Sequence, residues 1–132
     1  MSKFFSLLLF LTLLFFTSCD PGMILKISTT DKNNKIIIYA KKSMLPHAGN
    51  DSTKMILQIP PENNPSKKDT LFFYGIGTWQ DSGFVGEFAK SFDSIVIYQS
   101  KNRKVIRGNE AIKNYLIQNR SGAMKNVIHL QE

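Results

Sequence analysis

The stretch DSIVIYQSKNRKVIR, residues 93–107, carries the clearest local structure in the chain. Its apolar run IVIY (95–98) is made of β-branched and aromatic residues, which favour strands. Residues 101–103, Lys-Asn-Arg, predict a turn, and residues 104–107 predict a short second strand. The stretch therefore predicts two consecutive strands joined by a basic turn.

The same reasoning extends outward to both ends of the chain. Apolar runs bounded by turn residues predict further strands at residues 23–28, 35–40, 54–59, 70–76 and 124–130. A polar turn separates the first two of these strands, so we expect them to pair as a hairpin. Glycines mark residues 75–86 as an irregular stretch between strands.

Residues 109–119 break the strand pattern and predict one short helix. Ile112, Tyr115 and Leu116 follow the i, i+3, i+4 spacing of a helix face, and Asn109 is a suitable cap. We therefore expect a mainly β domain, either a β-sandwich or a curled antiparallel sheet, with one short helix near residues 109–119. An α+β arrangement is the alternative.

The N-terminus has the pattern of an export signal. Lys3 precedes an apolar run of 13 residues, 4–16, which contains only two polar residues. As a helix this run would span roughly 20 Å, less than the roughly 30 Å of a bilayer's hydrocarbon core. Its length suits the central region of a signal peptide, and an uncleaved membrane anchor is the alternative.

The end of this run, Phe16-Thr17-Ser18-Cys19, resembles the lipobox of bacterial lipoproteins. The resemblance implies cleavage between Ser18 and Cys19 and attachment of a diacylglycerol to the Cys19 thiol. Phenylalanine at the first lipobox position departs from the usual leucine. Cys19 is the only cysteine of the chain, which excludes an internal disulfide and a cysteine metal cluster.

The expected organisation is a signal peptide at 1–18, a lipidated cysteine with a short tether at 19–22, and a single strand-rich domain at 23–132. Removal of the signal leaves 114 residues with 16 basic and 10 acidic side chains, because Lys3 is the only charged residue removed. The resulting net charge of +6 would attract anionic lipid or acidic glycan. The alternative is that the charge only keeps the domain soluble.

The order of elements resembles small lipoproteins of Bacteroides-like bacteria whose function is unassigned. In these proteins, too, a hydrophobic hairpin follows the lipidated cysteine, and a strand, basic turn, short helix and final strand close the chain. The resemblance carries no functional residue across. Surface display in such bacteria follows an acidic patch after the cysteine, and only Asp20 is acidic here. We therefore expect an outer-membrane lipoprotein facing the periplasm, with the cell surface as the alternative.

Two groups of residues are candidates for binding. Trp79 and Tyr74 could stack on a sugar ring or contact another envelope protein, or they could close one end of the core. The densest basic group is either a binding site for anionic lipid or glycan or a charged sheet edge, and consists of Lys101, Arg103, Lys104 and Arg107. Nucleic acid is not expected as a partner, because the chain carries an export signal.

Catalytic motifs are not found in the sequence. His47 and His129 lack a second ligand at helical spacing, and no nucleophile elbow occurs. We expect no metal and no cofactor. Ser52, in Asp51-Ser52-Thr53, matches the O-glycosylation motif of Bacteroides-like bacteria. The predicted function is a non-enzymatic binding or structural module at a membrane, and the alternative is a small envelope hydrolase acting on glycan or cell-wall material.

Overall fold

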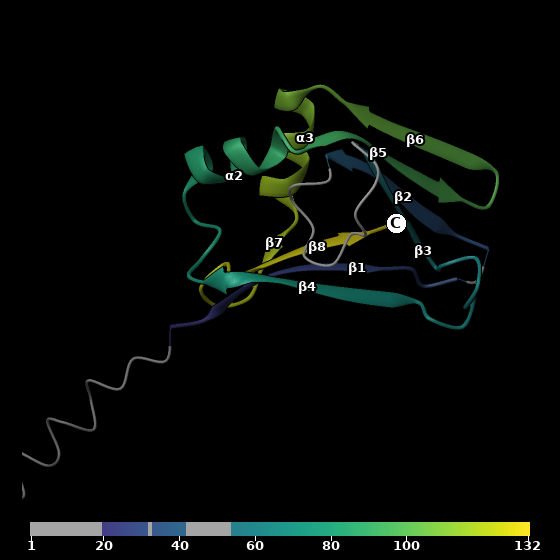
Figure 1. Ribbon diagram of the computed structural model, residues 1–132, viewed down its shortest axis with the longest axis horizontal. Helices are drawn as coiled ribbons and strands as arrows, with labels where there is room; N and C mark the ends of the chain where they lie inside the picture. The colour runs from purple at the N-terminus through teal and green to yellow at the C-terminus, as the bar shows by residue number, and fades with distance from the viewer. Residues whose placement is uncertain (1–19, 32, 42–53) are drawn as a thin grey trace, which may run out of the picture.

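The computed structural model describes residues 20–31, 33–41 and 54–132, which form a mainly β structure with two helices (Figure 1). The strands belong to two four-stranded sheets, called sheet A and sheet B below. Sheet A forms one layer. Sheet B and the two helices lie on the opposite side of the core (Figure 1).

Sheet A has the strand order β4-β1-β8-β7. β1 (Gly22–Ser28) pairs antiparallel with β4 (Asp69–Ile76) and parallel with β8 (Val127–Gln131). The two-residue strand β7 (Arg120–Ser121) pairs antiparallel with β8. β1, the first strand of the described chain, is therefore paired on one side with β4, from the middle of the sequence, and on the other with β8, from its end.

Sheet B is antiparallel throughout and has the order β3-β2-β5-β6. Its edge strands are β3 (Lys54–Ile59) and β6 (Asn102–Arg107). Its central strands are β2 (Lys35–Lys41) and β5 (Phe92–Gln99). The two strands predicted from residues 93–107 are β5 and β6, which pair with each other as expected.

The predicted hairpin of the first two strands is wrong, because β1 and β2 lie in different sheets. β1 uses both of its hydrogen-bonding edges for β4 and β8, whereas β2 uses its edges for β3 and β5. A strand has only two such edges, so β1 and β2 cannot also pair with each other. The connection between them crosses from one sheet to the other.

Two helices are present where the sequence predicted one. α3 (Asn109–Gln118) is the predicted helix, although Gly108, with φ 85°, occupies the cap position expected of Asn109. α2 (Ser82–Ala89) lies in the stretch predicted to be irregular. It begins after Asp81, whose carboxylate accepts a hydrogen bond of 2.7 Å from the backbone N–H of Gly83.

One hydrophobic core joins both sheets and both helices. Its fully buried side chains include Leu25 and Leu130 of sheet A, Ile38 of sheet B and Leu116 of α3. Ile97 of β5 belongs to this core, and Ile37 of β2 is buried outside it, with 4% and 8% of their surfaces exposed. In the described part of the chain, neither α2 nor α3 is long and apolar enough to cross a bilayer.

Candidate binding face on sheet B

The alternation of side chains along β6 divides the basic group into two sets. Ile106 is buried in the core, so Lys104, two residues before it, lies on the same inward side of the sheet. The Lys104 ammonium lies 5.3 Å from the centre of the Tyr115 ring of α3. Arg103 and Arg107 lie on the opposite, outward side of β6. Strand geometry thus brings two of the four predicted basic residues to one face and turns Lys104 away from them.

Aromatic side chains accompany these arginines across the sheet. Arg107 is opposite Ser94 of β5, and Ser94 is opposite Tyr39 of β2. Further along the same face, toward the basic turn, Arg103 of β6 is opposite Tyr98 of β5. The Arg103 guanidinium carbon lies 5.6 Å from the centre of the Tyr98 ring, within the range of a cation–π contact.

Lys35 adds a third cation to this side of sheet B. Its ammonium lies 4.7 Å from the centre of the Tyr98 ring, which therefore has two cationic neighbours. We call this surface the basic–aromatic face, and it consists of Lys35, Tyr39, Tyr98, Arg103 and Arg107.

A shallow, open hollow of ≈ 310 Å³ lies within the basic–aromatic face. The hollow is lined by Tyr39, Asp93, Ser94, Val96, Arg103 and Arg107. Asp93 is exposed at an irregularity in the pairing of β2 with β5, and it is the one carboxylate among these lining residues. Within the described residues, neither arginine forms an ion pair with it or with any other carboxylate. The hydrogen-bonding groups of both guanidiniums are therefore available to a negatively charged ligand.

The spacing of the two arginines indicates the size of ligand that both could contact. They are four residues apart on one strand, so their Cα atoms are separated by roughly 13 Å. If each side chain extends straight out from the strand, two bidentate contacts need two negative groups rather than one. An extended ligand with repeated negative groups fits this spacing better.

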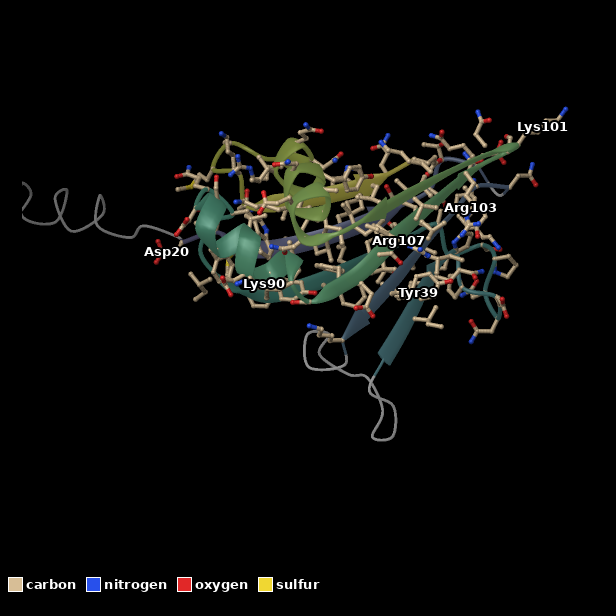
Figure 2. All side chains as sticks on the ribbon, turned by 90° about the horizontal axis from the view of Figure 1, so that it is seen from above. Asp20, Tyr39, Lys90, Lys101, Arg103 and Arg107 are labelled. Atoms are coloured by element: carbon tan, nitrogen blue, oxygen red, sulfur yellow. The ribbon has the colours of Figure 1, made fainter. Side chains whose placement is uncertain are left out.

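The basic turn lies far from the start of the described chain. Figure 2 shows Arg107, Arg103 and Lys101 in order along β6 and its turn, with Asp20 at the opposite end of the molecule. The eight residues of β5, which leads to this turn, span roughly 26 Å. Lys101 itself is exposed at the tip.

Trp79 lies in the core and is fully buried. Its indole N–H donates a hydrogen bond of 3.2 Å to the carbonyl of Ile24, and its ring centre lies 4.9 Å from that of Phe88. Arg120 donates a 2.8 Å hydrogen bond to the Trp79 carbonyl. Trp79 is therefore placed to close one end of the core, and its buried ring does not fit an exposed stacking platform.

Tyr74 belongs to the same aromatic cluster, with its ring centre 5.7 Å from that of Trp79. Burial raises the pKa of the Tyr74 hydroxyl, which makes no hydrogen bond in the described part of the protein. A small cavity of ≈ 260 Å³ lies beside these rings and is lined by Tyr74, Trp79, Phe84, Glu87 and Phe88. Its lining is largely hydrocarbon, unlike that of the hollow on sheet B.

A serine–histidine pair on the outward face of sheet A was not predicted from the sequence. The Ser28 hydroxyl lies 2.5 Å from His129 Nε2. Partial burial, together with the positive charge of Lys26, lowers the pKa of His129. The alternation of inward and outward side chains along β1 and β8 could have indicated from the sequence that Ser28 and His129 each face outward. Only the parallel pairing of these two strands shows that the residues lie side by side.

Within the described part of the chain, this pair has no carboxylate partner and no metal cluster beside it. Among the described residues, no carboxylate hydrogen-bonds to the His129 ring. The same part of the chain has no cluster of three histidine, aspartate or glutamate side chains that could hold a metal. Ser18, Cys19, His47 and Ser52 are among the residues named by the sequence analysis that lie outside the described residues, and their roles stay predictions.

Comparison with known proteins does not assign the chain to a family or a fold. No protein-family model matches the chain, and neither a curated protein nor a solved structure matches it significantly.

Proposed function

We propose that this protein is an envelope lipoprotein, anchored by acyl chains on Cys19, whose basic–aromatic face binds an anionic envelope polymer. The anchor rests on the signal-like N-terminus and on Phe16-Thr17-Ser18-Cys19. The proposed location is the outer membrane, with the domain in the periplasm. The two sheets facing each other across one core support the description of the domain as a β-sandwich closed at one end by helices.

The observation that carries the binding proposal is the placement of Arg103 and Arg107 on one face. Both guanidiniums border the same hollow, and neither has a carboxylate partner among the described residues. Tyr39 supplies a ring on which a sugar could stack, and Tyr98 holds the Arg103 guanidinium on the same face. Polymers that combine sugar rings with carboxylate or phosphate groups match both features.

The position of the basic turn favours a polymer over the headgroups of the protein's own membrane. Electrostatic attraction between exposed charges is screened over about 8 Å at physiological ionic strength. Figure 2 shows the turn at the opposite end of the molecule from Asp20, and β5, the strand that leads to the turn, is by itself roughly 26 Å long. Attraction to that bilayer would therefore be weak at Lys101 and Arg103.

The binding proposal is tested by calorimetric titration of the lipidated protein in nanodiscs with polygalacturonate and with inorganic polyphosphate. R103A/R107A is expected to weaken binding of the recognised polymer about tenfold or more, because two charge-assisted contacts are lost. K101A/K104A removes the same charge from the same hairpin and is the matched control. Neutral dextran and vesicles containing phosphatidylglycerol complete the comparison.

The outcomes separate specific binding from general charge attraction. A large loss in R103A/R107A with a small loss in K101A/K104A supports the basic–aromatic face. Equal losses in both double variants, or binding only to the anionic vesicles, would contradict it.

A small envelope hydrolase is the second candidate, and the Ser28–His129 pair is the observation that favours it. A histidine with a lowered pKa is neutral near pH 7 and could accept the proton of a serine hydroxyl. Reaction with a fluorophosphonate probe tests this candidate. Labelling of the wild type that disappears in S28A and in H129Q would favour hydrolysis, and absence of labelling would exclude an activated serine at this position.

A further inference from the structure

The outward face of sheet A changes from apolar to polar along its strands. Where β1 begins, Ile24 is flanked by Phe73 of β4 and Val127 of β8. At the other end of β1 the corresponding row is polar and consists of Asp69, Ser28 and Gln131. Lys26, Leu71 and His129 form the mixed row between them. The apolar end of the sheet is therefore the end at which the described chain starts.

Further apolar side chains gather at this end. Ile76, paired with Gly22 at the tip of sheet A, has 70% of its surface exposed, and Phe73 has 60%. Met124, which is 49% exposed, lies in the turn before β8. This turn is fixed beside the start of β1, because the N–H of Ile24 donates a 2.9 Å hydrogen bond to the carbonyl of Asn126. We call these residues the tether-end surface: Ile24, Phe73, Ile76, Met124 and Val127.

The start of the chain holds this surface close to Cys19. Only Asp20 and Pro21 separate Cys19 from Gly22, so the cysteine lies within about 11 Å of the first residue of β1. The Phe73 ring lies over Gly22, and a Cβ at position 22 would come too close to this ring. Glycine at position 22 thus lets an exposed phenylalanine sit directly beside the tether.

From these contacts we propose that the tether-end surface rests in the interfacial region of the bilayer to which Cys19 is anchored. The proposal rests on the lipid anchor of the proposed function. Acyl chains on Cys19 would place the membrane within reach of Phe73 and Ile76, whose hydrocarbon surface gains by leaving water.

Two lysines are consistent with an orientation in which the tether-end surface faces the bilayer. Lys26 lies in the mixed row beside Leu71, one step from the apolar row. Lys125 is exposed in the turn that carries Met124, and its carbonyl is fixed by a 2.9 Å hydrogen bond from the N–H of Trp79. Cations flanking an apolar patch are suited to the anionic headgroups around it. In this orientation the polar row of sheet A and the basic turn of sheet B would lie away from the bilayer.

The test uses the full-length lipidated protein in vesicles of phosphatidylethanolamine and phosphatidylglycerol. Acylation occupies the thiol of Cys19, so a cysteine introduced elsewhere is the one free thiol for a fluorophore. I76C places the fluorophore on the tether-end surface, and K101C places it on the exposed basic turn as the matched control. Nitroxide-labelled phospholipid should quench the fluorophore at position 76 several-fold more strongly than the one at position 101.

Negative charge introduced on the tether-end surface provides a second, independent test. With the fluorophore at M124C, the additional changes F73E and I76E should reduce quenching by the nitroxide lipid to the level of the K101C control. Both replaced side chains are largely exposed, so the fold should tolerate the changes, and circular dichroism checks this.

The contrary outcomes are distinct. Equal lipid quenching at positions 76 and 101 in acylated protein would overturn the inference and leave the anchor intact. Protection of position 76 from aqueous iodide without lipid quenching would indicate contact with a second copy of the chain, and would also overturn it. Mass spectrometry showing an unmodified Cys19 would refute the anchor of the proposed function and this inference with it.

Discussion

The indole N–H of Trp79 donates a hydrogen bond to the carbonyl of Ile24, which joins the segment before α2 to β1 of sheet A. The acceptor lies on the strand that follows the tether, at the point where Ile24 pairs with Val127 of β8. The same indole packs against Phe88 of α2. A single side chain thus links the helical end of the core to the start of the folded chain.

Replacing Trp79 with phenylalanine should therefore destabilise the domain. W79F loses the hydrogen bond to Ile24 and leaves part of a fully buried site empty, which together should cost about 1–3 kcal/mol. Q80A, at the exposed neighbouring position, is the control and should change the stability by less than about 0.5 kcal/mol. Chemical denaturation followed by circular dichroism measures both, and equal stabilities of the two variants would refute the structural role of Trp79.

The two buried isoleucines of sheet B should differ in their effect on stability. Ile97 belongs to the main core cluster, so I97A should cost about 2–5 kcal/mol. Ile37 is buried on the outward side of the sheet, opposite Val96, and lies outside that cluster. I37A should therefore destabilise less than I97A, because the outward face can relax around the missing atoms. Denaturation midpoints test the order, and a loss below about 0.5 kcal/mol at both positions would contradict the assignment of β2 and β5 as buried strands.

The shifted pKa of His129 determines the direction in which the stability of the fold changes with pH. Burial and the charge of Lys26 lower the pKa of His129 below the ordinary value of 6.5, so the folded state binds fewer protons than the unfolded state. The contribution of His129 to stability is therefore present above about pH 6.5 and is lost as the pH falls below it. NMR titration of the imidazole should give a pKa under 6.5, and K26Q should move it upward. An unchanged pKa in K26Q would show that the lysine does not act on this ring.

The strands were predictable from the sequence because they coincide with local runs of apolar residues. Residues 93–107 and 35–40 predicted β5, β6 and β2, and the helical spacing near Ile112 predicted α3. Pairing between distant segments was not predictable. β1 pairs with β4 and β8 through registers that no local pattern specifies, and so the predicted hairpin was wrong.

The missed helix α2 had a weaker local signal. Two glycines in eight residues, Gly83 and Gly86, favour irregular structure over helix. Asp81 at the cap position and the apolar spacing of Val85, Phe88 and Ala89 were the available signs. Gly86 is buried where α2 meets α3, and a Cβ at this position would lie 3.4 Å from the Lys113 side chain. This distance is an ordinary contact with a flexible side chain, so the packing of α2 against α3 does not require glycine at position 86.

The candidate binding face was only partly predictable. The sequence identified Arg103 and Arg107 as members of a basic group. Alternation along the predicted strand 104–107 already separates Lys104 from Arg107, but the sequence placed Arg103 in the turn, and only the burial of Ile106 shows which side of the strand faces outward. Tyr39 and Lys35 join the face through pairing of β2 with β5, which is not visible in either segment alone.

The lipid anchor makes a direct prediction about localisation. C19A removes the thiol that would carry diacylglycerol, so the variant should lose acylation and should accumulate as a precursor with its signal uncleaved. Metabolic labelling with a radioactive fatty acid measures acylation, and the mass of the purified protein measures signal cleavage. C19A that still carries the label would contradict the anchor.

The most direct test of the binding proposal is to locate the bound polymer by NMR. Isotope-labelled lipidated protein in nanodiscs is titrated with polygalacturonate and, in a separate sample, with inorganic polyphosphate while the backbone amide signals are recorded. The proposal predicts that at least one polymer causes concentration-dependent shifts at Tyr39, Ser94, Arg103 and Arg107, with the amide of His129 on the outward face of sheet A unchanged. Shifts confined to sheet A, or none with either polymer up to millimolar repeat units, would contradict polymer binding at the basic–aromatic face.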